Sequence, residues 1–333
     1  MAFAHDFTAT VDGQRLCFEI TNKTRKTVAV TYEGSISDHK TPELTGTVVI
    51  PPKVKHNDVV YDVTAIGGKA FANAARLKGI VIPPGVESIG DFAFEGCDSL
   101  ANIVFPGNRV TFGQGVFFNC TAISGVAIGS DWQTVDLSMF RWSKALTSVF
   151  IPAKIEKIQG VKKLKHLTSI TVDPNNTRFS SADGMLYSKD GSTFYACPRA
   201  YVGKVTVREG VTKVTDGALI DCAGVTSIDF PSTLRSVSFR ETSRMKRLDC
   251  VAMRADRPMD TGYIGGKGKF LFQLVNQETR ILVPASAKKL YEDALATEPG
   301  EYSDSSDGVP YTVTKAELPL RKNIKGTKDF EKN

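Results

Sequence analysis

The sequence is poor in the residues from which catalytic and metal sites are built. It has four histidines, no two of which are four residues apart, and no pair of cysteines has the C-x-x-C spacing. A zinc site of the common kinds needs one of these spacings, and a catalytic triad needs a histidine with suitable neighbours. We therefore expect no catalytic residue, no metal, no cofactor and no enzymatic activity; an enzyme of an unrecognised type ranks last among the functions considered.

Long apolar runs and a strong charge of one sign are also missing. No segment approaches the roughly 18 to 20 apolar residues of a membrane-spanning helix, so membrane insertion is not expected. The net charge is +6, from 42 Lys and Arg against 36 Asp and Glu, and it is spread along the chain. That balance is too weak to predict a nucleic-acid partner without a concentrated patch.

The first residues carry neither the charged region nor the apolar region of a signal peptide. Ala2-Phe3-Ala4 nevertheless has the A-x-A form that precedes signal cleavage. One interpretation is that the chain starts close to a mature N-terminus, with the signal peptide already removed; the alternative is an ordinary disordered start.

The number of cysteines is too low for a scaffold stapled by disulfides. Cys97 and Cys120 stand 23 residues apart. Cys222 lies in an Asp-Cys-x-x-Val segment that matches the sequence around them, so all three cysteines occupy the same position of the repeat. A cysteine that recurs at one repeat position is usually a small buried hydrophobic residue. We predict that all six are free: Cys17, Cys97, Cys120, Cys197, Cys222 and Cys250.

What the sequence does have is a strict repeat of 23 residues between positions 63 and 152. Three sets of apolar residues, here called columns, recur at this interval. The first column contains Phe71, Phe94, Phe117 and Phe140, and the second contains Leu77, Leu100, Ile123 and Leu146. The third contains Ile66, Ile89, Phe112, Val135 and Ile158. A period of 20 to 29 residues with an L-x-x-I-x-I element indicates a solenoid, in which each repeat buries its apolar face by stacking on its neighbours.

The repeat at Ile89 reads Ile-Gly-Asp-Phe-Ala-Phe-Glu-Gly-Cys-Asp-Ser-Leu-Ala-Asn-Ile-Val-Phe-Pro. It resembles the BspA-like (Treponema pallidum-type) leucine-rich repeats of secreted and surface proteins, and the resemblance extends over residues 44–284. It implies a β-rich, right-handed leucine-rich-repeat solenoid of about 23-residue repeats. An N-terminal antiparallel β cap and a C-terminal strand-helix cap would cover its ends.

The pattern divides the chain into five segments. These are an N-terminal β-hairpin cap (1–43), a first repeat array (44–172), a hairpin insertion (173–201), a second array (202–260), and a C-terminal cap with a loose tail (261–333). Alternating apolar residues with Asp12-Gly13 between two runs predict about three strands in the first segment. In the last segment we expect a final strand at 281–284, a helix at 287–295, an acidic loop at 298–308 and a loose tail after Leu320.

One residue of each repeat strand lies between two inward-facing residues and is predicted to face outward. This outward column is mostly apolar in the first array, which is typical of a contact surface. A partner molecule or a flanking strand of the same chain would each explain it. The column contains Val81, Val104, Ala127, Phe150, Thr171 and, later, Asp229.

Arg141 and Trp142 stand where an earlier repeat has Glu95 and Gly96. Tryptophan and arginine are frequent anchors of interfaces, and an exposed tryptophan also stacks on sugar rings. The alternative is that Trp142 only fills a local gap. Trp132 shares its column with apolar residues and is predicted to lie in the core.

The resemblance implies a non-catalytic cell-surface or secreted module that binds a host protein, matrix protein or glycan through its repeat sheet face. The candidate partner-binding residues are Val81, Val104, Phe150, Thr171, Arg141 and Trp142. The alternative is a structural spacer or self-assembling surface element without a soluble ligand. The sequence does not settle the oligomeric state.

Overall fold

The computed structural model describes residues 5–34, 40, 42–237, 245–258, 263–264, 279–294, 300–304, 310–313 and 324–328. It divides into two compact units, the first made of Met1–His166 with Val172–Thr177 and the second of Leu167–Thr171 with Arg178–Asn333. Each unit is described by itself. The finer division into five segments stays a prediction.

The first unit begins with antiparallel strands. They are β1 (Phe7–Val11), β2 (Gln14–Asn22) and β3 (Thr27–Thr31), paired in that order. Asp12 and Gly13 have positive φ values of 48° and 76°, as the two central residues of a tight hairpin turn require. A second antiparallel hairpin follows, of β5 (Lys53–His56) with β6 (Val59–Ile66).

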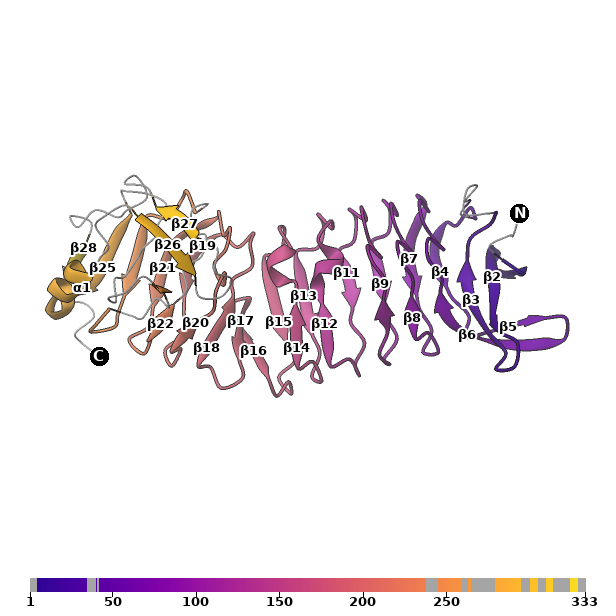
Figure 1. The fold of residues 1–333 in the computed structure, drawn as a ribbon, viewed down its shortest axis with the longest axis horizontal. Helices are drawn as coiled ribbons and strands as arrows, with labels where there is room; N and C mark the ends of the chain where they lie inside the picture. Colours follow the sequence, from indigo (N-terminus) through magenta and orange to yellow (C-terminus); the bar gives the residue numbers. More distant parts are fainter. Residues whose placement is uncertain are drawn as a thin grey trace. The chain divides into compact units, whose positions relative to one another are not determined.

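From β6 onward the chain builds two parallel ladders, which Figure 1 shows as successive short strands. One ladder contains β6, β8 (Ser88–Ile89) and β10 (Thr111–Phe112). The other contains β4 (Gly46–Val49), β7 (Leu77–Val81), β9 (Asn102–Val104) and β11 (Gly125–Ala127). Residues paired from β6 through β10 and from β7 through β11 are 23 positions apart, as in Ile89 with Phe112 and Ile103 with Val126, whereas β4 pairs with β7 at 31 or 32 positions.

The repeated apolar columns form the core of this unit. Phe94 stacks on Phe71 at 4.9 Å and on Phe117 at 5.3 Å, between ring centroids. All four phenylalanines of that column and all four residues of the leucine column are at most 1% exposed. The predicted core is therefore confirmed for these columns; in the third column Phe112 and Ile158 are only half-buried.

After β11 the strands are β12 (Thr134–Asp136), β13 (Ser148–Ile151) and β14 (Lys157–Gln159), with β12 parallel to β14. Two 3-10 helices, η1 (Leu137–Phe140) and η2 (Val161–Lys163), replace the turns of the earlier repeats. β10 ends one sheet and β12 begins another. The ladder is thus interrupted between them.

The second unit contains two sheets of five strands each. A five-stranded sheet contains β16 (Phe179–Ala182), β17 (Met185–Ser188), β18 (Thr193–Ala196), β20 (Lys213–Val214) and β22 (Ser236–Val237). The other contains β19 (Gly203–Thr206), β21 (Val225–Phe230), β23 (Cys250–Met253), β25 (Arg280–Pro284) and β28 (Ile324–Thr327). β15 (Ser169–Val172) lies at the boundary of the units. The 23-residue step recurs, as in Ile228 with Val251.

The end of the chain corrects two predictions. The tail after Leu320 was expected to be loose, but β28 pairs in parallel with β25, and Ile324 is 3% exposed. This burial and the open edge of β25 explain why the segment is ordered. Likewise the expected loop at 298–308 contains strand β26 (Gly300–Asp304), which pairs with β24 (Tyr263–Ile264) and β27 (Pro310–Val313).

The expected C-terminal helix is present as α1 (Lys288–Ala294), preceded by the 3-10 turn η4 (Ala285–Ala287). Tyr291 anchors it, since its ring is buried and its hydroxyl donates to the carbonyls of Ala255 and Arg257 at 3.1 and 2.9 Å. The helix therefore packs on the core of the second unit.

Candidate partner-binding surface

An exposed apolar stripe crosses the β4-β7-β9-β11 sheet of the first unit. Val49 pairs with Val81, Val81 with Val104, and Val104 with Ala127, so the four side chains lie in one row. Val49 is 45% and Val104 44% exposed; Ala127 is exposed and Val81 is half-buried. Their neighbours in each strand, such as Ile80 and Ile103, are buried, because side chains alternate between the two faces of a strand.

Two other members of the predicted outward column lie on later strands. Phe150 on β13 is 49% exposed, which is unusual for a phenylalanine. Thr171 on β15 is exposed as well, but it belongs to the second unit. The structure therefore brings Val81 and Val104 together in one sheet and leaves Thr171 apart from them in a different unit.

Asp229 occupies the outward position of β21, yet it is only 5% exposed. Its carboxylate accepts from Arg254 Nε at 2.7 Å, from Arg254 Nη2 at 2.8 Å and from Lys204 Nζ at 3.0 Å. Burial acts to raise the pKa of Asp229, but these two cations more than offset it and hold the pKa below its usual range. The outward face of the second unit is thus closed by ion pairs at this position.

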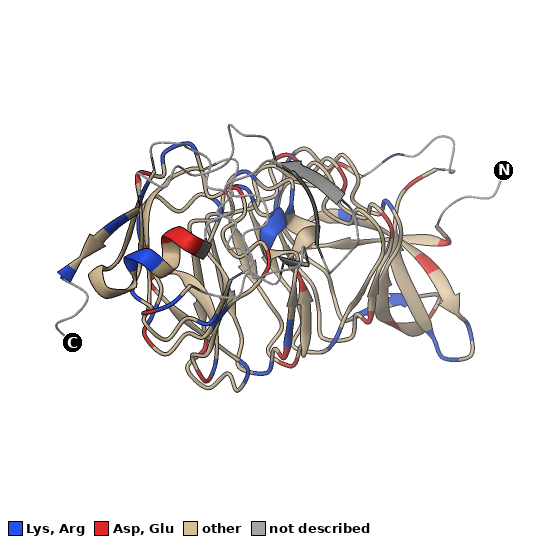
Figure 2. Ribbon diagram, turned by 60° about the vertical axis from the view of Figure 1, so that its left-hand side comes forward, with Lys and Arg blue, Asp and Glu red and all other residues tan. Residues whose placement is uncertain are grey.

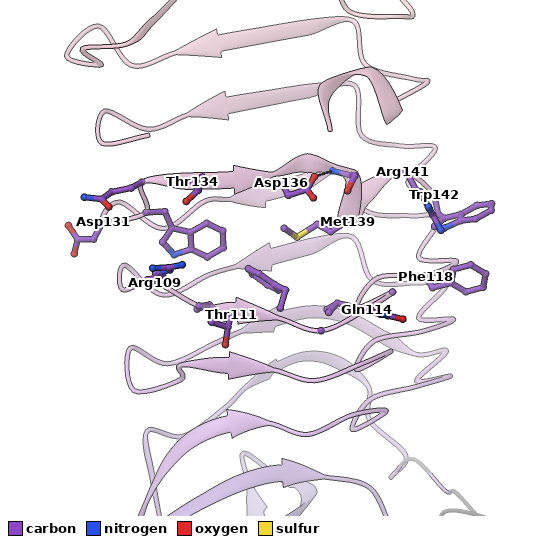
Figure 3. Close-up of a pocket in the computed structure, with 18 residues that line it drawn as sticks. Arg109, Thr111, Gln114, Phe118, Asp131, Thr134, Asp136, Met139, Arg141 and Trp142 are labelled. Carbon is purple, nitrogen blue, oxygen red and sulfur yellow. Dashed lines mark hydrogen bonds between the residues drawn. The ribbon is translucent and has the colours of Figure 1, made fainter. Parts of the chain in front are cut away.

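Arg141 and Trp142 lie on the turn after η1 and contact each other. The Arg141 guanidinium sits 5.3 Å from the centre of the Trp142 ring, and this ring packs edge-on against Phe118 at 5.1 Å. Trp142 is still 40% exposed, so filling a gap is not its whole role. Both residues line a cavity of about 670 Å³ between β10 and β12, and Figure 3 shows them at one end of it.

The predicted core position of Trp132 is confirmed, with a refinement. It is 3% exposed, and its indole Nε1 donates to the carbonyl of Asn108 at 2.7 Å. It also lines the cavity, which the candidate residues Val81, Val104 and Phe150 do not. Of the six candidate residues, Val81 and Val104 thus lie on the apolar stripe and Arg141 and Trp142 at the cavity, whereas Phe150 and Thr171 belong to neither group.

Two features of these surfaces were absent from the sequence predictions. Val49 belongs to the stripe, and the signal for it was available, because Val48-Val49-Ile50 has the same inward-outward-inward pattern as the later strands. The cavity was missed altogether. The sequence does contain a signal for the cavity. Glycine occurs at 23-residue intervals at Gly67, Gly90 and Gly113, but the next residue at this interval is Asp136.

In the described parts of the chain, no group of three or more His, Cys, Asp or Glu residues is placed to hold a metal ion. No helix among the described segments is long and apolar enough to cross a membrane. Figure 2 shows basic and acidic residues interspersed along the ribbon.

Comparison with known proteins points to one family. The family described as BspA type leucine-rich repeat region matches residues 62–182 and 186–253, in six copies. No curated protein matches the chain. Leucine-rich repeat domains generally mediate protein interactions, and the family indicates no enzymatic activity.

Several solved structures resemble the chain at low sequence identity. The pneumococcal vaccine antigen PcpA is 13% identical, with a TM-score of 0.51 over 85% of this chain and 82% of that one. A leucine-rich repeat protein of Bacteroides ovatus is 18% identical, with a TM-score of 0.46 over 84% and 79%. The T. pallidum leucine-rich repeat protein is 17% identical, with a TM-score of 0.40 over 70% and 87%.

The first of these likenesses shows a common fold and nothing about a ligand. The family match, in contrast, extends over more than half of the sequence and coincides with the stacked strands described above. The chain therefore belongs to the BspA-type leucine-rich repeat family.

Proposed function

We propose that this chain is a non-catalytic binding module of a secreted or cell-surface bacterial protein, which recognises a host protein, matrix protein or glycan through its repeat sheet face. The observation that carries the proposal is the row Val49, Val81, Val104 and Ala127, apolar and largely exposed across four paired strands. Contiguous exposed apolar surface of this kind marks contact sites.

The proposal includes a finer description of the fold. Within each unit the repeats wind as right-handed coils of about 23 residues, as the pairing offsets support. β1 to β3 act as an N-terminal cap, and β25 with α1 as a C-terminal one. Stacked repeats hold the stripe rigid before a partner arrives, so that little conformational entropy is lost on binding.

A binding screen tests this function. The purified chain is assayed against matrix proteins and a glycan array, next to a Val104→Asp and a Phe150→Asp variant. Asn102→Asp is the matched control, because it adds the same charge to β9 at an exposed position but removes no apolar surface. Binding that is lost in Val104→Asp and kept in Asn102→Asp would support the proposal.

Self-assembly is the competing outcome. If no partner binds and the wild-type chain self-associates with rising concentration in analytical ultracentrifugation, the apolar stripe serves contacts between copies. Val104→Asp would then be monomeric. The proposal of a separate partner would fall, and the structural-element function would replace it.

A further inference from the structure

The backbone hydrogen bonds that join neighbouring repeats are interrupted between β10 and β12, and β11 and β13, one repeat apart, also lie in different sheets. Elsewhere the bonds are regular: Thr111 N donates to Glu87 O at 2.9 Å, and Gly113 N to Ile89 O at 2.8 Å. The turns are joined as well, as by Phe94 N to Val116 O at 2.9 Å. In the described chain no backbone hydrogen bond connects residues 110–119 with the matching residues 133–142, one repeat later.

The two repeats stay joined on both sides of this interruption. At one end Asp131 N donates to Gly107 O at 2.9 Å. At the other end Ser143 Oγ donates to Cys120 O at 3.2 Å, and Lys144 N to Thr121 O at 3.1 Å. The interruption between β10 and β12 is therefore a slot with a contact between the two repeats at each end. It coincides with the 670 Å³ cavity, and Figure 3 shows Thr111 and Gln114 on one side of this cavity and Thr134 and Asp136 on the other.

The glycine column gives the physical cause. A Cβ atom on Gly113 would lie 2.6 Å from Asp91 N and 2.8 Å from Gly90 C, so the repeats approach closely only because this position has no side chain. One repeat later the residue is Asp136, whose Cβ would meet the same obstacle. Its carboxylate instead accepts from Ser138 N at 2.9 Å and caps η1. The slot is thus encoded in the sequence.

The walls of the slot are two facing strand edges. By analogy with the joined repeats, the N–H groups of Thr134 and Asp136 point toward β10, and the carbonyls of Val110 and Phe112 toward β12. These groups have no backbone partner across the slot. An open strand edge is a template for an added strand.

The slot has apolar walls in the middle and positive charge at its ends. Phe112 and Met139 are half-buried in its lining. Its two carboxylates already have partners, Asp131 with Lys154 Nζ at 2.5 Å and Asp136 with the η1 cap. Arg109 and Arg141 also line it, and neither guanidinium has a carboxylate partner among the described residues.

We propose that the slot between β10 and β12 binds an extended peptide segment with acidic residues at its ends and an apolar residue in its middle. The peptide backbone pairs with the two strand edges, the apolar side chain contacts Phe112 and Met139, and the acidic side chains meet Arg109 and Arg141. This site is distinct from the apolar stripe on β4 to β11 and does not depend on the function of that stripe.

A peptide fits these features better than a sugar. The open N–H and C=O groups recur at the spacing of a strand, which a peptide backbone matches and a pyranose ring does not. Trp132, which lines the slot, is 3% exposed and donates to the carbonyl of Asn108, so it offers no stacking platform. An acidic sugar would pair with the two arginines but not with the strand edges. The experiment includes tetragalacturonate in order to distinguish an acidic sugar from a peptide.

The chain reports on this slot without a label, because its two tryptophans, Trp132 and Trp142, both line it. Tryptophan emission is followed while the full chain is titrated with a pool of capped pentapeptides that carry aspartate at both ends and an apolar residue in the middle. A pool with lysine at both ends and an acidic pool with N-methylated amides are run in parallel, as is tetragalacturonate.

We expect a saturable emission change with the acidic pool, a much weaker one with the N-methylated pool, and none with the lysine pool. Arg109→Glu and Arg141→Glu, both at exposed positions, should each weaken binding by about tenfold or more. Lys144→Glu is the matched control, because Lys144 is exposed near Trp142 but does not line the slot; its affinity should equal that of the wild type.

Three results would overturn the proposal. One is the absence of a saturable change with the acidic pool. Another is unchanged affinity in both arginine variants while circular dichroism shows them folded. The third is a response to tetragalacturonate that the acidic pool does not give, which would assign the slot to an acidic sugar. None of these results bears on the apolar stripe, so this proposal and the proposed function fail separately.

Discussion

The phenyl rings of Phe71 and Phe94 stack face to face, with their centroids 4.9 Å apart and their planes 1° from parallel. The two residues are 23 positions apart, so one step along the sequence repeat is one step through the core. Because Phe117 continues the stack at 5.3 Å, Phe94 is enclosed on both faces. Aromatic pairs of this kind stabilise the folded state beyond the free energy gained by burying the rings.

Phe94→Ala should therefore destabilise the chain by about 3 to 5 kcal/mol, since it removes a fully buried ring and leaves a cavity between two others. Urea unfolding followed by circular dichroism measures the loss. Phe150→Ala is the control, because Phe150 is 49% exposed, and should change stability by less than about 1 kcal/mol. Equal losses for the two variants would contradict the assignment of the core.

The success of the sequence predictions follows from the same step. The residues of one column occupy matching places in successive repeats, so several phenylalanines at one spacing support one another, and the four of the Phe71 column were confirmed as buried. The end of the chain lacks this support. Ile324 belongs to no repeat column. Only the structure shows that Ile324, in β28, pairs with Ile281 in β25.

Glycine should be required in the Gly67, Gly90 and Gly113 column. A Cβ at Gly90 would lie 2.5 Å from Gly68 N and 2.9 Å from Gly67 C, both backbone atoms that cannot turn aside. Gly90→Ala should cost about 1 to 3 kcal/mol by overpacking. At Gly107 the nearest atom is the rotatable Ser130 Oγ at 3.3 Å, so Gly107→Ala should be tolerated. Similar melting temperatures of the two variants would refute this account.

The same column shows where sequence reasoning stopped short. Apolar columns were followed because they build the core, whereas the slot arises from a change in a column of glycines, at Asp136. A loss of glycine is visible in the sequence. The opening of the slot is not visible there, because it depends on how closely the backbones of two neighbouring repeats approach each other.

The cysteines should behave as inert core residues. All six are free, and five of them are buried; Cys250 is partly exposed. Burial raises the pKa of the Cys17 thiol to about 11, so almost no thiolate exists at neutral pH. In the folded chain Ellman's reagent should react with Cys250 first and with the other five only on unfolding. A cross-linked peptide containing Cys97 and Cys120 on a non-reducing map would contradict this.

The ion-pair cluster at Asp229 should make stability depend on pH. Burial acts against its carboxylate, but the hydrogen bonds from Arg254 and Lys204 prevail and hold its pKa below the ordinary value of 3.8. A group with a lowered folded-state pKa stabilises the fold above the unfolded-state pKa, and this contribution is lost as the pH falls through the lower folded value. The cluster therefore contributes fully at pH 7 and progressively less below about pH 4.

Asp229→Asn keeps the shape of the side chain and removes its charge. At pH 7 this should lower the free energy of unfolding by about 1 to 3 kcal/mol, since two charged donors lose their carboxylate. Urea unfolding at several pH values should show the difference between wild type and variant shrinking below pH 4. Asp256→Asn is the control, because Asp256 is exposed and its closest cation, Arg257 Nε, is 3.9 Å away. A difference for Asp229→Asn that stays constant from pH 7 to pH 3 would mean that shape and packing, not charge, explain the effect.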